Sequence, residues 1–269
     1  MNDQQFDRLK ARLETLLGLD LTAYKQAQMR RRITTHISRT NSDVDEFITQ
    51  LGSDPEELAE LRDMITINVT EFFRDEAQWT QLRRTVLPQV IEGANGRPSI
   101  WSAGCSTGQE PYSLAMMLDE AKALDRATLL GTDFDRDALA KARNGGPYRA
   151  EEMKGVPAQQ LEDHFIQDAK GLTASPALKR RLKFRELNLL KDRFGRGYDM
   201  VVCRNVMIYF TGEVKSDLIS RFVGSLKPNG VLFIGATEAL LGDDLSGLDR
   251  LGGNFYRKTD DSGSISRVA

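Results

Sequence analysis

The sequence predicts an α/β fold in which a doubly wound, mostly parallel sheet follows an all-helical N-terminal domain. Three observations support this prediction. No strand pattern occurs before residue 98, short apolar runs alternate with helical patterns from residue 99 onward, and the turn dipeptide Asn95-Gly96 separates the two regimes. Strands that alternate with helices form βαβ units, whose helices cover both faces of a parallel sheet.

The first 85 residues are predicted to form a helical domain. Phe6, Leu9 and Leu13 recur at helical spacing. Further helices are expected over 22–39 and 44–51. The sequence SDPE at 53–56 resembles an N-cap followed by proline in the first turn of a fourth helix.

The second domain is predicted over 86–269. Its expected strands cover 99–103, 128–132, 183–187, 198–203, 230–236 and 255–258, and its expected helices cover 110–122, 136–143 and 213–225. The stretch 144–181 is too long for a simple connection, which indicates a small insertion at the rim of the sheet. The polar tail over 259–269 is expected to be disordered.

The composition excludes several classes of protein. A formal net charge of -2 gives no global basic field of the kind that marks a nucleic-acid binder. The polar first residues and the lack of a long apolar run predict a cytoplasmic protein without membrane insertion. With two cysteines and two histidines, a disulfide and a structural zinc site are not expected, so no metal is assigned.

The strongest local signal is WSAGCSTGQEPYSLAM, residues 101–116, which is typical of a strand, a glycine turn and a helix. Gly104 and Gly108 permit close approach of a ligand to the backbone, and the start of the helix near Glu110 favours an anion such as a carboxylate or pyrophosphate. The spacing is not G-x-G-x-x-G, which disfavours a nicotinamide cofactor. Asp133, at the end of the second strand, is placed to accept hydrogen bonds from ribose hydroxyls. These features alone also fit a generic nucleotide-binding fold.

Five segments in order resemble motifs of the CheR family of chemoreceptor methyltransferases. They are NVTEFFRD (68–75), WSAGCSTGQEPYSLAM (101–116), GTDFD (131–135), LNLL (187–190) and CRNVMIYF (203–210). The resemblance implies an S-adenosylmethionine-dependent methyltransferase fold with a helical N-terminal domain and a small antiparallel β insertion, here about 144–181. It also implies that glutamate side chains of chemoreceptors are methylated, which leaves S-adenosylhomocysteine.

The same resemblance assigns site residues. Arg74 is expected to bind the methionine carboxylate, Glu110 the amino group and Asp133 the ribose, while Asn188 and Leu189 are expected to contact adenine. The full set of expected cofactor contacts is Asn68, Thr70, Arg74, Gly104, Glu110, Asp133, Asn188, Leu189, Arg204 and Asn205. Arg74 and Tyr209 are candidates to line the active site, although a packed tyrosine fits as well. Phe72 and Phe73 are predicted to be core, and Cys105 is interpreted as a small pocket-lining residue and not a nucleophile.

No catalytic acid or base is assigned. A glutamate side chain has a reference pKa of about 4.3 and is ionised near pH 7. Such a carboxylate attacks a sulfonium methyl without a general base, so in-line positioning and removal of water are the expected means of catalysis.

The substrate-binding prediction is a basic helix without acidic residues between Leu21 and Ser42. Its candidate contacts are Lys25, Arg30, Arg31, Arg32 and Arg39. Lys25, Arg32 and Arg39 are seven residues apart and are expected to share one helical face. The predicted partner is the cytoplasmic helical domain of chemoreceptors. An RNA methyltransferase that uses these cations for phosphate contacts is the alternative, and a non-enzymatic cofactor-sensing module is a third hypothesis.

The insertion bears on docking. Some members of the family grip a peptide at the receptor C-terminus by strand addition to the insertion. The hairpin is expected to start at His164, Phe165 and Ile166 and to return after Pro176. Its compact loop around 168–171 predicts independence from a receptor C-terminal pentapeptide.

Overall fold

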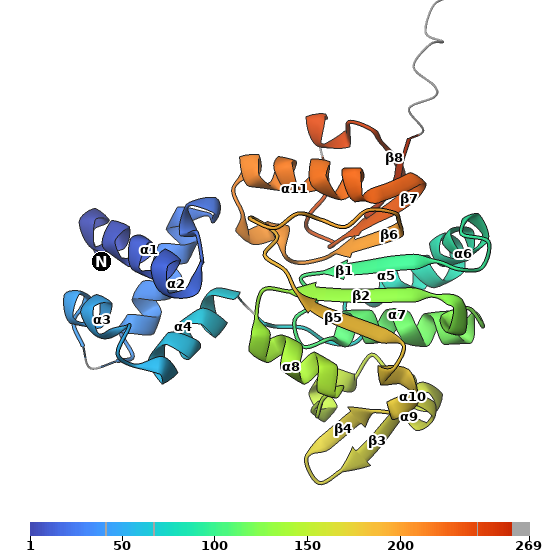
Figure 1. The fold of residues 1–269 in the computed structure, drawn as a ribbon, viewed down its shortest axis with the longest axis horizontal. Coiled ribbons are helices and arrows are strands. Elements are labelled where there is room, and N and C mark those ends of the chain that lie inside the picture. Colours follow the sequence, from blue (N-terminus) through green and yellow to red (C-terminus); the bar gives the residue numbers. More distant parts are fainter. Residues whose placement is uncertain (41, 67, 241, 260–269) are drawn as a thin grey trace, which may run out of the picture. The chain divides into compact units, whose positions relative to one another are not determined.

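The computed structural model describes residues 1–40, 42–66, 68–240 and 242–259 (Figure 1). Apart from Thr259, the tail predicted to be disordered lies outside the described residues. The chain forms two compact units, which we call the N-terminal unit (Met1–Asn68 with Tyr209–Val214) and the sheet unit (Val69–Ile208 with Lys215–Ala269). The units divide after residue 68, whereas the sequence places a boundary after 85, because Phe72 and Trp79 already pack in the core of the sheet unit.

The N-terminal unit is helical, as the sequence predicts. Its helices are α1 (Asp3–Leu17), the 3-10 turn η1 (Leu21–Ala23), α2 (Gln26–Ile37), α3 (Val44–Gln50) and α4 (Pro55–Thr66). Local chemistry fixes their ends. Asn2 and Gln5 form a capping box at the start of α1, Gly18 ends α1 in the left-handed conformation, and Asp43 caps α3.

Helix α2 is shorter than the predicted helix over 22–39. It runs over Gln26–Ile37 because the preceding residues form the separate turn η1. Lys25 is therefore the N-cap of α2, and Arg39 lies beyond its last residue. The prediction that Lys25, Arg32 and Arg39 share one face of a helix is wrong, since only Arg32 lies in α2.

The sheet unit contains a seven-stranded sheet in the order β5-β2-β1-β6-β7-β9-β8 (Figure 1). The strands are β1 (Ser99–Ala103), β2 (Thr128–Asp133), β5 (Leu182–Glu186), β6 (Tyr198–Cys203), β7 (Leu226–Ile234), β8 (Leu248–Gly252) and β9 (Phe255–Lys258). The first five in this list pair in parallel, and β9 is antiparallel to both β7 and β8. The mostly parallel sheet confirms the predicted fold class.

The central strand β1 shows how both faces are covered. Ile100 points into a core shared with Leu114 of α7 (Gln109–Glu120). Its neighbour Trp101 points to the other face, where its ring lies 5.5 Å from that of Phe222 in α11 (Gly212–Ser225).

The other helices of the unit are α5 (Glu76–Gln81), the π-helix η2 (Leu82–Val86), α6 (Leu87–Gly93), η3 (Leu124–Arg126), α8 (Arg136–Asn144), η5 (Met207–Tyr209, ending in the N-terminal unit) and η6 (Gly242–Leu245).

The insertion contains a two-stranded antiparallel hairpin, β3 (Phe165–Asp168) and β4 (Gly171–Ala174). The prediction that the hairpin returns after Pro176 is wrong. The return strand follows the first after only two residues, and Pro176 instead begins the short helix α10 (Pro176–Lys179), with Ser175 as its N-cap. The insertion also holds η4 (Ala150–Met153) and α9 (Ala158–His164).

Both cysteines are buried free thiols, as predicted for a chain without disulfides. Burial raises the pKa of Cys105 well above its usual value, which favours a protonated, packed side chain over a nucleophile. No helix in the described parts of the chain combines the length and apolar character needed to cross a membrane.

Candidate active site

The carboxyl ends of four neighbouring strands define the candidate site. Strands β5, β2, β1 and β6 are parallel and adjacent, so the loops that follow them emerge at one edge of the sheet. The chain progresses from β1 to β2 and β5 on one side and to β6 and β7 on the other. Such a reversal between β1 and β6 is the point at which open parallel sheets bind ligands.

The glycine turn after β1 has the geometry of a cofactor cradle. Gly104 has φ +74°, and a Cβ there would lie 2.5 Å from Cγ2 of Val206. Gly108 has φ +97° and precedes α7 as an N-cap that has no side-chain hydrogen bond. The first N–H groups of α7 therefore remain available to an anionic group at this edge of the sheet.

Asp133 ends β2 beside this turn. Its Oδ2 accepts a hydrogen bond from the N–H of Ser106 at 2.7 Å, and its Oδ1 accepts one from the N–H of Asp135 at 2.9 Å. Each carboxylate oxygen has a second lone pair that can accept from a ligand hydroxyl. Burial raises the pKa of Asp133 to about 6, although these hydrogen bonds oppose the shift.

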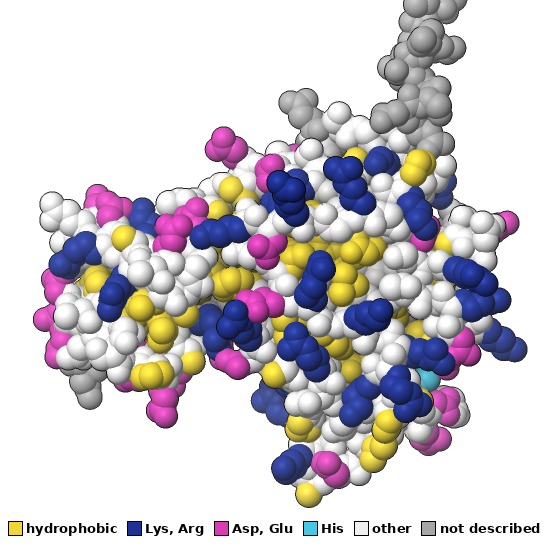
Figure 2. Space-filling view, in the orientation of Figure 1, with side chains coloured by type: hydrophobic (Ala, Val, Ile, Leu, Met, Phe, Trp, Pro, Cys, Tyr) yellow, Lys and Arg dark blue, Asp and Glu magenta, His cyan; other side chains and the backbone are white. Residues whose placement is uncertain are grey.

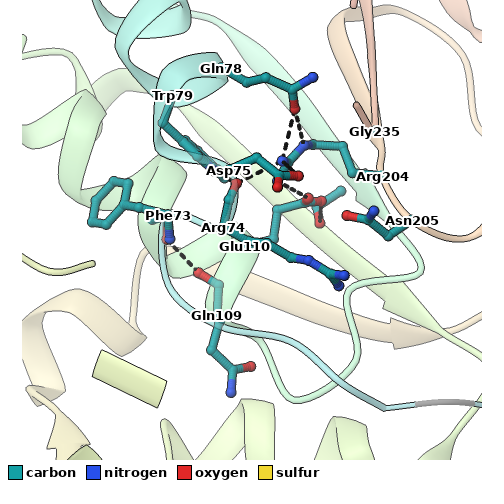
Figure 3. Close-up of polar contacts among 12 residues, drawn as sticks. Phe73, Arg74, Asp75, Gln78, Trp79, Gln109, Glu110, Arg204, Asn205 and Gly235 are labelled. Carbon is teal, nitrogen blue, oxygen red and sulfur yellow. Dashed lines mark hydrogen bonds and ion pairs between the residues drawn. The ribbon is translucent and has the colours of Figure 1, made fainter. Parts of the chain in front are cut away.

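Arg204, directly after β6, is the centre of a buried polar cluster (Figure 3). Its Nη2 donates to the carbonyl oxygen of Arg74 at 2.7 Å, to Oε1 of Gln78 at 2.9 Å and to Oδ2 of Asp75 at 3.0 Å. The guanidinium carbon lies 5.4 Å from the ring centroid of Trp79. Arg204 thus fastens the 74–79 segment to the end of β6, and its expected contact with the cofactor stays a prediction.

Glu110, in the first turn of α7, points toward Arg204 (Figure 3). Its Oε2 lies 3.6 Å from Nη1 of Arg204, and its Oε1 accepts a hydrogen bond from the Ser102 hydroxyl at 2.8 Å. Burial raises the pKa of Glu110, and the positive charge of Arg204 opposes that shift. The carboxylate is therefore held in one orientation beside the glycine turn.

Glu238 is a site-building residue that was not assigned a role from the sequence. Its Oε2 accepts from the N–H groups of Asn205 and Gly235, each at 2.8 Å, and its Oε1 accepts from the N–H of Ile208 at 3.1 Å. These bonds hold Asn205 at φ +60°, a conformation that non-glycine residues adopt at a cost. A lone carboxylate within the apolar run from Gly230 to Gly242 is the signal that points to it.

The loop after β5 carries Asn188 and Leu189. Oδ1 of Asn188 accepts from the N–H of Leu190 at 2.9 Å, which closes a local turn. Leu189 is buried, and its carbonyl oxygen accepts from Arg221 at 2.6 Å. The turn brings an amide and an apolar side chain to the same edge as Asp133, and the adenine role of both stays a prediction.

The NVTEFFRD motif is divided between the two units. Thr70 and Arg74 belong to the sheet unit, where Nη1 of Arg74 donates to the carbonyl oxygen of Val69 at 3.1 Å. Asn68 and Tyr209 belong to the N-terminal unit, and their expected roles stay predictions. Phe72 and Phe73 are buried in the core of the sheet unit, which confirms that expectation.

The cations predicted to bind substrate divide into two groups. Arg30 donates to the carbonyl oxygen of Met1 and forms an ion pair with Asp3, and Nη2 of Arg32 donates to the carbonyl oxygen of Met64 in the last turn of α4. These two arginines hold the N-terminal unit together. The exposed members of the set are Lys25, Arg31 and Arg39.

One group of potential metal ligands occurs in the described part of the chain, namely His36, Glu57 and Glu60 in the N-terminal unit. Nε2 of His36 and Oε1 of Glu57 are 2.5 Å apart, which is a direct hydrogen bond. That bond accounts for the closeness of His36 and Glu57.

Comparison with known proteins agrees with this geometry. Residues 68–247 match the family described as "CheR methyltransferase, SAM binding domain", and residues 4–66 match "CheR methyltransferase, all-alpha domain". The chain is 39% identical over 244 residues to a chemotaxis protein methyltransferase of Listeria monocytogenes, with 90% of this chain and 93% of the relative covered. It is 37% identical over 248 residues to chemotaxis protein methyltransferase 1 of Pseudomonas aeruginosa, with 87% and 90% covered.

The doubly wound sheet, the glycine cradle and the family match together define an S-adenosylmethionine-dependent methyltransferase. More narrowly, the chain belongs to the CheR methyltransferase family. A more distant relative, the chemotaxis protein methyltransferase of Escherichia coli, is 31% identical over 249 residues and covers 88% of this chain and 85% of its own length.

Proposed function

We propose that this enzyme transfers the methyl group of S-adenosylmethionine to glutamate carboxylates on the cytoplasmic helical domain of chemoreceptors. The products are glutamate methyl esters and S-adenosylhomocysteine, and the reaction takes place in the cytoplasm. The observation that carries the proposal is the match of both family domains along the chain, together with relatives that are named chemotaxis protein methyltransferases. These relatives do not favour the RNA methyltransferase alternative.

The site chemistry suits a carboxylate acceptor, which needs no general base. His164, the one histidine of the sheet unit, ends α9, where it lies 3.5 Å from Asp119. Burial raises the pKa of Tyr112 and of both cysteines, so these groups hold their protons at neutral pH. The side chains at the strand ends thus orient and desolvate rather than transfer protons.

The strand-end residues fit S-adenosylmethionine, whose sulfonium supplies an activated methyl group. The tight turn at Gly104, which packs against Val206, leads to the N-terminus of α7, whose N–H groups have no side-chain cap and can serve as donors. We assign Asp133 to the ribose hydroxyls, Glu110 to the amino group and Arg74 to the methionine carboxylate. Asn188 and Leu189 are assigned to adenine. Arg204 and Asn205, which hold the loop after β6, remain proposed cofactor contacts.

The product distinguishes this function from its alternatives. With methyl-labelled cofactor and a receptor cytoplasmic fragment, we expect label that is released as methanol in mild alkali, because carboxyl methyl esters hydrolyse readily. Incorporation should fall in acid as the acceptor glutamate protonates near its reference pKa of about 4.3. Alkali-stable label on lysine, or label transferred to RNA, would contradict the proposal.

We also propose that the exposed cations near α2 contact the receptor. Arg32→Glu is a poor test, because Arg32 holds the end of α4. Arg31→Glu with Arg39→Glu changes only exposed side chains, and is expected to raise the KM for receptor while the affinity for cofactor stays the same. The contrary outcome is an unchanged KM at low salt, where surface charges are least screened.

Independence from a receptor C-terminal pentapeptide remains part of the proposal. The β3–β4 turn has only two residues, and Oδ1 of Asp168 accepts from the N–H of Lys170 at 2.7 Å within it. The outer edge of β4 is bridged to Tyr148 at Leu172, which leaves less edge for an added strand. We expect no saturable binding when the pentapeptide is titrated calorimetrically. Micromolar binding that maps to residues 144–181 would overturn this.

A further inference from the structure

The connection between β5 and β6 leaves part of the sheet uncovered. Residues 187–197 contain no helix in the structure. On the face to which Trp101 points, Phe222 and Phe194 cover β1. Farther along the same face the register aligns Leu130 with Lys183, and there Lys183 is exposed and Leu130 only half-buried.

A groove of about 550 Å³ follows this uncovered region around the edge strand β5. Its apolar lining comes from Leu130, which shares the face of Lys183, and from Leu182 and Phe184, which alternate with Lys183 along β5 and face the other side. Its cations are Arg143, Lys179, Lys183 and Arg185, and we call the whole the basic groove. Figure 2 shows Lys and Arg side chains gathered around exposed apolar side chains on the visible face of this unit.

The positive charge of the basic groove is not neutralised internally. No ion pair joins Lys183 or Arg185 to a carboxylate in the described part of the chain. Arg143 and Lys179 are hydrogen-bonded to backbone carbonyl oxygens, at 3.4 and 3.3 Å. The nearby Glu186 is engaged by Arg136, whose Nε lies 2.7 Å from its Oε2.

The outer edge of β5 presents backbone groups on the side away from β2. The N–H of Leu187 donates to Asp133 of β2, and the peptide groups of successive strand residues alternate in direction. The backbone groups of Phe184 and Glu186 therefore point away from β2, toward the edge that no described strand covers, where the carbonyl oxygen of Phe184 accepts from Arg143. Lys183 and Arg185 lie two residues apart, which is about 6.6 Å along a strand.

We infer that the basic groove binds a carboxylate-rich segment of the receptor and holds it as a second contact during methylation; this rests on the proposed function. Cations without a carboxylate partner, set beside apolar side chains along the edge strand, complement a segment with alternating acidic and apolar side chains. A nucleic acid fits less well, since Phe184 is the groove's one aromatic side chain and is half-buried, and the chain's net charge is -2.

The test compares two double variants in the full chain. Lys183→Glu with Arg185→Glu reverses the groove, and Arg84→Glu with Arg97→Glu reverses two exposed cations elsewhere in the sheet unit. Each pair changes the formal net charge from -2 to -6, because two reversals remove four positive units. The control therefore matches the variant in overall charge.

For the groove variant we expect the receptor KM and the calorimetric Kd for a receptor fragment to rise about tenfold at low salt. Turnover at saturating receptor and the affinity for S-adenosylhomocysteine should stay unchanged, and the difference from the control should shrink at 0.5 M salt. Lys183→Ala with Arg185→Ala, which keeps the strand without adding repulsion, should give a smaller rise.

Equal KM and Kd in the groove variant and the control would overturn the inference. So would tight binding of RNA by the wild type that the groove variant alone loses while the receptor Kd is unchanged. If the wild type binds the receptor fragment but forms no base-labile ester, the proposed function fails, and the binding comparison still decides whether the groove is a contact.

Discussion

Replacing Arg204 by methionine is expected to lower the free energy of unfolding of the sheet unit by about 3–5 kcal/mol, the usual cost of removing one partner of a buried ion pair. The substitution leaves the Glu110 carboxylate buried without its cation. It also removes the donor that satisfies Gln78 and the carbonyl oxygen of Arg74. Lysine should recover only part of the loss, because an ammonium group has fewer donors than a guanidinium group and lacks its planar, delocalised shape.

Urea unfolding followed by tryptophan fluorescence measures this effect selectively. Both tryptophans of the chain, Trp79 and Trp101, lie in the sheet unit, and Trp79 stacks on Arg204. Arg97→Met, at an exposed position of the same unit, is the matched control and should change stability by less than about 0.5 kcal/mol. A similar midpoint in the two variants would show that the Arg204 cluster does not stabilise the unit.

Much of the sheet unit can be read from local sequence, because its parallel strands are buried on both faces. Strand β1 forms over the predicted 99–103, and β6 over the predicted 198–203. Strand β8 is not predicted, since Leu248–Gly252 has two adjacent charged residues, Asp249 and Arg250, and shows neither an apolar run nor a period of two. The predicted helix extends past the end of α2 because polar residues continue beyond Ile37. The turn that ends α2 is made by the backbone, and no side chain marks it in the sequence.

In the candidate site, features that depend on neighbouring residues can be predicted from the sequence, whereas contacts between residues far apart in the chain cannot. The glycine turn and Asp133 are visible in sequence, since each follows directly from a strand end. The bonds of Arg204 to Asp75 and Gln78 join residues more than 120 positions apart in the sequence. Only the strand order brings such groups together, so the bonds of Arg204 to Asp75 and Gln78 cannot be predicted from the sequence.

The affinity for S-adenosylhomocysteine is expected to depend on pH through Asp133. The proposed ribose contact uses the carboxylate as a double acceptor, and a protonated acid loses one of those acceptor sites. Since burial places the pKa of Asp133 at about 6, the acceptor form is nearly complete at pH 7.5 and scarce at pH 5. Asp133→Asn should bind about tenfold to a hundredfold more weakly at pH 7.5, the effect of one lost charge-assisted hydrogen bond.

The sign of the pH effect follows from proton linkage. The ligand selects the carboxylate form, so binding releases a proton from the fraction of molecules that carry one, and affinity falls as the pH drops through 6. With one proton and a pKa of about 6, the loss between pH 7 and pH 5 is about tenfold. Calorimetry on the wild type should show this slope and on Asp133→Asn a flat profile. A slope that persists in Asp133→Asn but vanishes in Glu110→Gln would move the titrating group to Glu110, whose pKa burial also raises.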